Sequence, residues 1–194
     1  MLVWSYRASY GFPAIITRGS NTYGHHQYPE KIIPLFITNA IDDLPLPIYG
    51  SGRAVRDYIH VEDHCRAIDL VLHAGEVGET YNIGTGVETS GLEVANAVLK
   101  ATGKPESLIE FVQDRLGHDY RYAVDTAKIR ALGWTPRIDF AEGLSDTVDW
   151  YLAHQDWWRP LKSGEYWEYY RRNYKPLQDA TAGPGQRPGS RPSN

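Results

Sequence analysis

A short apolar segment near the start of the chain, Pro13–Arg18, constrains the fold more than any other feature of the sequence. The segment is rich in β-branched residues, and turn-forming residues flank it, a pattern typical of a strand buried on both faces. The backbone amide and carbonyl groups of such a strand must pair with neighbouring strands. No other segment has this character, so we expect strand 13–18 to need partners that the chain does not visibly supply.

The rest of the chain alternates helical and strand-like patterns, which places it in the α/β class. A buried helix is expected over Pro29–Ile41, because this segment is apolar on nearly every side. In the next helix, Cys65, Ile68 and Leu72 have helical spacing and predict its apolar stripe. A capping box that begins at Ser90 predicts the start of another helix. Further helices are expected over 125–133, 139–158 and 165–174, and short strands within 44–61, 78–86 and 108–112.

The composition excludes several classes of protein. The single cysteine, Cys65, permits neither an intrachain disulfide nor a cysteine metal cage, which favours a reducing compartment. The net charge of −4 argues against sequence-independent nucleic-acid binding, which needs a basic surface. No apolar run approaches the roughly 20 residues that a membrane span requires. We therefore expect a cytoplasmic protein that binds neither nucleic acid nor a membrane.

Five motifs follow one another along the chain: RGSNTYG…YPEKIIP, PLPIYGSGRAVRDYIHVEDH, GETYNIGTG, DRLGHDYRYAVDTAKIRALGW and WWRPLKSGEYWEYYRRNY. In this order and spacing they resemble the C-terminal half of the dTDP-glucose 4,6-dehydratases, which belong to the extended short-chain dehydrogenase/reductase superfamily. The resemblance runs from Tyr6 to Lys175. The motifs YIHVEDH and YNIG alone would indicate only a nucleotide-sugar epimerase or dehydratase, whereas DRLGHDYRYA indicates the 4,6-dehydratase branch.

The resemblance implies an α/β fold that is the C-terminal part of an extended, Rossmann-type dehydrogenase/reductase, with the last sheet strand followed by a small mixed substrate-binding domain. Residues 1–28 would then be a remnant of the NAD-binding domain, made of the end of a helix, strand 13–18 and a loop. Residues 29–177 would form the nucleotide-sugar-binding domain. The composition of residues 178–194 predicts a disordered tail.

A nucleotide diphosphate-sugar has two phosphates, many hydroxyl groups and a flat base, so its site needs cations, polar groups and an apolar or aromatic wall. The chain offers side chains for all three roles. The expected cations are Arg56, Arg115 and His118, the polar contacts are Asn21, Lys31 and Asn82, and the wall is Pro47, Ile48 and Tyr49. By resemblance, the substrate positions also include Ile32 and Asp114.

The residues with which the family holds NAD are mostly absent from the sequence. It contains no GxGxxG or GxxGxxG turn, and none of its fourteen tyrosines has a lysine four residues later, as the family's catalytic base does. The family's Asp-Glu pair, which moves the C5 and C6 protons, also belongs upstream, so we assign no catalytic residue to this chain. By resemblance Thr22 would face the cofactor, where the family usually has Asn; His25-His26 and Leu116 also depart from the family pattern.

Simpler interpretations compete for several residues. His60 and His64 lie four residues apart, but Glu62 is third rather than second in HVEDH, so we expect structural roles and no metal site. The pair His25-His26 is interpreted as a loop feature. The aromatic residues near the C-terminus are expected to belong to the core or to an interface rather than to a platform for stacking bases.

Three functional hypotheses follow from the resemblance. In the first, the chain is the substrate-binding part of an NAD-dependent dTDP-glucose 4,6-dehydratase, which forms dTDP-4-keto-6-deoxyglucose by hydride removal from C4, loss of water across C5–C6 and hydride return to C6. The second is an epimerase or a UDP-glucuronate decarboxylase. The third is a truncated or split subunit with no catalysis of its own, which would need a separate N-terminal half. Because the chain has no assigned proton-transfer residue, we expect it to be inactive alone. Because the family forms homodimers through upstream helices, we also expect the lone chain to expose apolar surface and to aggregate.

Overall fold

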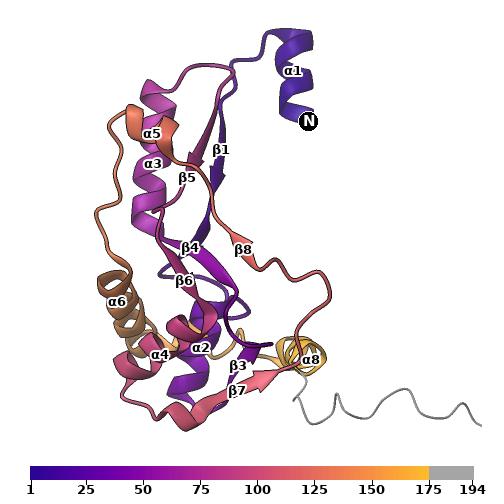
Figure 1. The fold of residues 1–194 in the computed structure, drawn as a ribbon, viewed down its shortest axis with the longest axis vertical. Helices are drawn as coiled ribbons and strands as arrows, with labels where there is room; N and C mark the ends of the chain where they lie inside the picture. Colours follow the sequence, from indigo (N-terminus) through magenta and orange to yellow (C-terminus); the bar gives the residue numbers. More distant parts are fainter. Residues whose placement is uncertain (175–194) are drawn as a thin grey trace, which may run out of the picture.

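The computed structural model describes residues 1–174, so the tail expected over 178–194 lies outside the described residues. The described part is elongated, with a parallel strand pair at one end, a four-stranded sheet in the middle and a second parallel pair at the other end (Figure 1). Helices pack beside each group of strands. The α/β class is confirmed, whereas the domain boundaries at residues 28 and 177 stay predictions.

Strand β1 (Ile16–Gly19) pairs in parallel with β5 (Thr80–Ile83). This pair lies at the end of the molecule that carries α1 (Leu2–Tyr10) (Figure 1). The expectation for β1 was wrong in two respects: the chain does supply one partner strand, and β1 is half-buried rather than buried on both faces. Within the described residues β5 is its one paired neighbour, which leaves the other edge of β1 uncovered.

The strand also begins three residues later than expected, and Pro13 explains the delay. Proline has no amide hydrogen to donate to a sheet. The amide of Ala14 donates to the carbonyl two residues earlier (2.9 Å), and its carbonyl accepts a bond from the Gly78 amide (2.8 Å). The first amide on this side to donate across to the other segment is that of Ile16, to the carbonyl of Glu79 (3.0 Å).

Helix α3 (Val61–Ala74) packs against this strand pair through a different face from the predicted one. The predicted stripe is exposed and consists of Cys65, Ile68 and Leu72. The buried residues are Asp63, Ala67 and Val71. The Asp63 carboxylate accepts hydrogen bonds from two successive backbone amides that follow α5 (Ala127–Ala131), at 2.9 and 3.0 Å. This buried polar anchor sets the rotation of the helix, and a search for apolar spacing alone could not find it.

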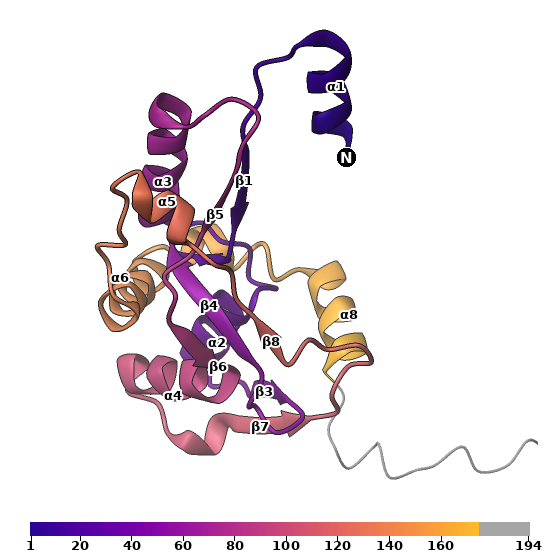
Figure 2. The ribbon, with the colours of Figure 1, turned by 45° about the horizontal axis from the view of Figure 1, so that its top comes forward.

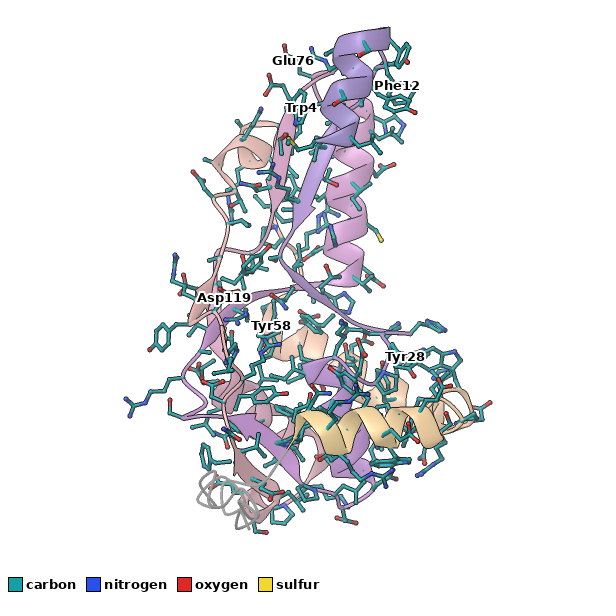
Figure 3. All side chains as sticks on the ribbon, turned by 90° about the vertical axis from the view of Figure 1, so that its right-hand side faces the viewer. Trp4, Phe12, Tyr28, Tyr58, Glu76 and Asp119 are labelled. Carbon is teal, nitrogen blue, oxygen red and sulfur yellow. The ribbon has the colours of Figure 1, made fainter. Side chains whose placement is uncertain are left out.

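Helix α1 buries none of its residues. Its exposed apolar side chains, together with one that follows the helix, are Leu2, Val3, Trp4, Tyr6, Tyr10 and Phe12. Figure 3 shows Trp4 and Phe12 at the end of the molecule far from Tyr28. The expected exposed apolar surface is therefore present at this end.

Strand β4 (Val55–His60) organises the middle sheet, because it pairs with three other strands. Tyr58 of this strand belongs to the larger hydrophobic cluster, and the next residue, Ile59, belongs to the smaller one. Since successive side chains of a strand point to opposite faces, β4 separates the two clusters. Its partners are β2 (Asn21–Tyr23) and β8 (Arg121–Tyr122), both parallel, and β6 (Glu88–Ser90), which is antiparallel.

The larger cluster lies among several helices and the parallel pair β3 (Leu46–Tyr49) and β7 (Ile109–Val112). Helix α2 (Ile32–Ile41) buries eight of its ten residues, as its apolar sequence predicts, although it starts three residues later than expected because Lys31 is extended at the N-cap. The capping box at Ser90 is confirmed. The other helices here are α4 (Gly91–Thr102), α6 (Phe140–Ala153) and α7 (Gln155–Trp158), and a short 3₁₀ helix, Glu106–Leu108, precedes β7.

Helix α8 (Gly164–Asn173) lies beside the end of β3 (Figure 2). The hydroxyl of Tyr49 donates to the Asn173 carbonyl (3.2 Å) and joins the two elements. Trp158 and Tyr166 are buried in the larger cluster, and further aromatic residues of α8 pack against it. The interpretation of the C-terminal aromatic residues as core residues is confirmed for these positions.

Lys162 is a buried cation that connects α8 to α2. Only 7% of the residue is exposed, and its Nζ lies 3.1 Å from the Asn39 Oδ1. The Nζ also lies 5.1 Å from the ring centroid of Trp167 and 5.5 Å from that of Trp158. Burial lowers the pKa of Lys162 to about 8, and the nearby Asp42 carboxylate only partly opposes this effect.

We therefore predict that the protein becomes more stable as pH rises from 7.5 to 9.5. An unfolded lysine has a pKa of about 10.4, so between pH 8 and that value the unfolded chain holds more protons and unfolding becomes less favourable as pH rises. The Lys162 contribution to this gain, measured as the difference between wild type and Lys162→Met, should be about 2 kcal/mol. Buried tyrosines with raised pKa values, such as Tyr58 and Tyr170, offset part of the gain near pH 9.5 equally in both proteins. Urea denaturation at several pH values measures it, with Lys104→Met as the control; equal slopes in wild type and Lys162→Met would contradict the prediction.

Candidate functional site: a cavity between β3, β4 and α8

A cavity of about 290 Å³ is bounded by the start of α2, strands β3 and β4, the loop that follows β7, and α8. Nine of the eleven predicted substrate residues line it: Asn21, Lys31, Ile32, Pro47, Ile48, Tyr49, Arg56, Arg115 and His118. These residues come from β2, the start of α2, β3, β4 and the loop after β7. The fold thus brings most of the predicted set to one place.

The two arginines that line the cavity are held in different ways. Arg56 is half-buried, and its guanidinium donates to the carbonyls of Val55 and Asp119, both at 2.7 Å. Figure 3 shows Asp119 and Tyr58 near the middle of the molecule, where β4 lies. Arg115 is exposed, and its guanidinium lies 5.5 Å from the ring centroid of Tyr49, a cation–π distance. One cation is therefore fixed by the backbone and the other is supported by an aromatic face.

Asp114 shapes the loop after β7 but does not line the cavity. Its Oδ1 accepts a hydrogen bond from the amide of Arg115 (2.9 Å) and lies 2.7 Å from the Nδ1 of His118. Its other oxygen packs against Gly50, which has a φ of +55°, and a Cβ at Gly50 would lie 2.9 Å from that oxygen. In this geometry Asp114 therefore holds the loop backbone at Arg115 and the ring of His118.

Two further predicted residues lie outside the cavity lining. The side-chain amide of Asn82 donates to the Asp125 carbonyl (3.0 Å). The hydroxyl of Thr22, predicted to face the cofactor, lies 2.7 Å from the His64 Nδ1. The structure therefore does not bring Asn82 and Thr22 together with the other predicted residues.

Sequence reasoning missed several aromatic residues of the lining. Tyr58 is buried, and burial raises its pKa to about 12 although the nearby Arg56 opposes the change, so its hydroxyl stays neutral. The strand period could have revealed it, because Tyr58 follows Arg56 by two positions and shares its face. Tyr169 and Tyr174 also line the cavity, and no periodic signal marks them. Both belong to the C-terminal aromatic residues, which were expected from the sequence to belong to the core or to an interface rather than to a binding site.

The predicted non-ligand histidines have separate structural partners. The Nδ1 of His60 accepts a hydrogen bond from the Glu62 amide (3.4 Å) at the start of α3, while His64 contacts Thr22. The Nε2 of His25 lies 2.9 Å from an Asp146 carboxylate oxygen. Among residues 1–174, no group of three or more His, Cys, Asp or Glu side chains is placed to hold a metal ion. Over the same residues, no helix combines the length and apolar character of a membrane span.

The α/β fold and its likeness to solved structures place the chain among the Rossmann-type proteins of the epimerase/dehydratase class. The family model described as GDP-mannose 4,6 dehydratase matches residues 1–147, so the chain belongs to that family. The resemblance to the dTDP-glucose 4,6-dehydratases is confirmed: one from Streptomyces niveus is 49% identical over 164 residues, which are 84% of this chain and 49% of that protein.

Solved structures give the same result. The dTDP-glucose 4,6-dehydratase of Bacillus anthracis, solved in complex with NAD, has a TM-score of 0.79 and 48% identity, over 84% of this chain and 52% of that one. A UDP-glucose 4-epimerase of Thermus thermophilus in complex with NAD has a TM-score of 0.73 and 33% identity, over 79% of this chain and 51% of that one. The chain spans about half the length of the curated relatives it matches.

The buried carboxylate of Asp57 ties the cavity strand β4 to the loop that follows β5. It is 0% exposed and accepts three hydrogen bonds, from the Thr85 amide (3.0 Å), the Thr85 hydroxyl (2.6 Å) and the Gly86 amide (3.0 Å). Since Asp57 lies between Arg56 and Tyr58, this anchor also fixes the two cavity residues beside it.

We predict that Asp57→Asn lowers the free energy of unfolding by about 2 kcal/mol, because the side-chain NH₂ would face a backbone donor and leave it unpaired. Urea denaturation measures the change. The control is Asp149→Asn on the exposed face of α6, which should change stability by less than about 0.5 kcal/mol. Equal stability of the two variants would mean that the Asp57 anchor contributes nothing specific.

Proposed function

We propose that the cavity binds the nucleotide diphosphate-sugar substrate of a 4,6-dehydratase, and that this substrate is dTDP-glucose. The observation that carries the proposal is the convergence of Arg56, Arg115 and His118 on one cavity that also has the aromatic ring of Tyr49. Cationic groups suit a diphosphate, and an aromatic wall suits a base. The match to dehydratases at 48–49% identity supports the same substrate class.

The polar residues of the cavity support a role in holding the sugar. Asn21 lies at the start of β2, opposite Tyr58 in the strand ladder. Lys31 is at the N-cap of α2, and its Nζ lies 2.8 Å from Glu30, which also lines the cavity. Amide, ammonium and carboxylate groups together can donate to and accept from sugar hydroxyl groups. Asn82 and Asp114, which do not line the cavity, stay predictions of the resemblance.

NAD, when bound, would supply the acceptor and donor of the hydride. The residues of this chain do not fit the binding of NAD, because the sequence has no Gly-rich turn and the Thr22 hydroxyl contacts His64. We therefore derive no catalytic step for the chain. A family homodimer or a separate N-terminal half that completes the enzyme stays a proposal.

The epimerase alternative has weaker support than the dehydratase. The Thermus epimerase is 33% identical and the Bacillus dehydratase 48% identical over similar shares of this chain. The loop that distinguishes the dehydratase branch in the sequence contains Arg115 and His118, and both line the cavity. The motif that indicates a dehydratase rather than an epimerase therefore also supplies two of the proposed diphosphate contacts.

Calorimetric titration of the purified chain with dTDP tests the proposed function. We expect saturable binding that weakens at least about tenfold in the Arg56→Ala, Arg115→Ala double variant, because each charge-assisted hydrogen bond contributes about 1.5–3 kcal/mol. The affinity should also fall as salt is raised.

Arg53→Ala is the matched control for this titration. Arg53 lies three positions before Arg56, is exposed and is absent from the cavity lining, so its removal takes away one of the two positive charges that the double variant loses without touching the site. If wild type and the double variant bind dTDP with the same affinity, or if neither binds it, the proposed function is wrong.

We further predict that the 194-residue chain with NAD and dTDP-glucose forms no 4-keto-6-deoxy product, because its sequence lacks a Tyr-x-x-x-Lys base and a Gly-rich turn. Chromatography of the reaction mixture measures the product. An intact dehydratase assayed in parallel is the positive control. Product formation that depends on NAD would contradict the assignment of no catalytic residue to this chain.

A further inference from the structure

A second cavity, of about 210 Å³, adjoins the proposed substrate cavity. Pro47 and Tyr174 line both cavities, so the Tyr174 side chain stands where one cavity gives way to the other. The second cavity is otherwise lined by residues before β3, by β7 and by α8. Its walls include the aromatic rings of Trp167 and Tyr170 and the apolar side chain of Val112.

Tyr174 is held at this boundary by packing on two sides. Its ring stacks on the ring of Tyr49, with centroids 5.3 Å apart and an interplanar angle of 28°. It also packs against Tyr170, with centroids 5.0 Å apart. The preceding residue, Asn173, accepts a hydrogen bond from the Tyr49 hydroxyl (3.2 Å), which fixes the end of α8. Burial also raises the pKa of Tyr174, so the ring carries no charge near the proposed diphosphate site.

The position of Tyr174 places it at the proposed base end of the substrate cavity. Pro47 and Tyr49 belong to the wall proposed for the base. Tyr174 stacks on Tyr49 and lines the same cavity as Pro47. With the ring in place, the cavity of about 290 Å³ is at the small end of the range for ligand sites. Without the ring, the base end would open into the further 210 Å³.

We propose that Tyr174 sets the depth of the base end, so that the cavity accepts a single-ring pyrimidine and excludes a two-ring purine. This inference rests on the proposed function, since it assigns a selectivity to the same nucleotide site. Tyr174 thus acts as a specificity residue supplied by the C-terminal helix, distinct from the cations that bind the diphosphate.

Competitive titrations with dTDP, dADP and dGDP test this assignment. The three nucleotides share the deoxyribose and the diphosphate, so their affinity ratios report on the base end alone. Wild type and Tyr174→Phe, which keeps the ring, should prefer dTDP. In Tyr174→Ala, dTDP should bind more weakly because the end wall and the packing partner of the Tyr49 ring are lost. Both purine nucleotides should bind more tightly than they do to wild type.

Tyr170→Ala is the matched control, because Tyr170 packs on Tyr174 and lines the second cavity but not the substrate cavity. If Tyr174 only anchors α8, both alanine variants lower the affinity for all three nucleotides by the same factor, and the inference is wrong.

Circular dichroism melts check that each variant folds. Should Tyr174→Ala not fold, Tyr174→Leu replaces it and must move the pyrimidine-to-purine ratio in the same direction. Wild type that binds no nucleotide contradicts the proposed function, whereas wild type that binds dTDP with an unchanged ratio in the variants contradicts this inference alone.

Discussion

The backbone of β4 must satisfy its hydrogen bonds in the interior of the molecule, and the rest of the structure depends on how it does so. The strand pairs with β2, β6 and β8, segments from three distant parts of the sequence. Its alternating side chains then serve two faces. Arg56 and Tyr58 line the proposed substrate cavity, while Asp57 anchors the loop after β5 and Ile59 enters the smaller cluster. A single strand thereby joins the proposed substrate site to the strand pair at the opposite end (Figure 1).

The aromatic residues at the C-terminal end have two roles that a sequence pattern does not separate. Trp158 and Tyr166 fill the larger cluster, and Lys162 lies among the rings of that region with its pKa lowered by burial. Tyr169 and Tyr174, from the same helix and the residue after it, line the cavity instead. Core packing of the first group holds the second group against β3. Aromatic stacking therefore links the stability of α8 to the shape of the proposed site.

Much of the cavity lining could be predicted from the sequence, because several ordered motifs identified the family and each predicted position could be transferred by its neighbours in the motif. The motif that contains Arg115 and His118 is of this kind, and both residues line the cavity. Some predicted residues do not line the cavity, and their side chains form hydrogen bonds or contacts within the protein. Asn82 donates to a backbone carbonyl and the Thr22 hydroxyl contacts His64, and neither pairing has a signal along the chain.

By itself, the sequence determined the α/β class, the buried character of α2 and the capping box of α4, since these depend on composition and on spacings of three or four residues. Tertiary structure alone decided which face of α3 is buried, because the Asp63 carboxylate binds amides more than seventy residues away. It also decided that β1 pairs with β5 and that Tyr174 meets Tyr49. The physical reason is the same in each case: these contacts join segments that are remote in the chain, and no local periodicity records them.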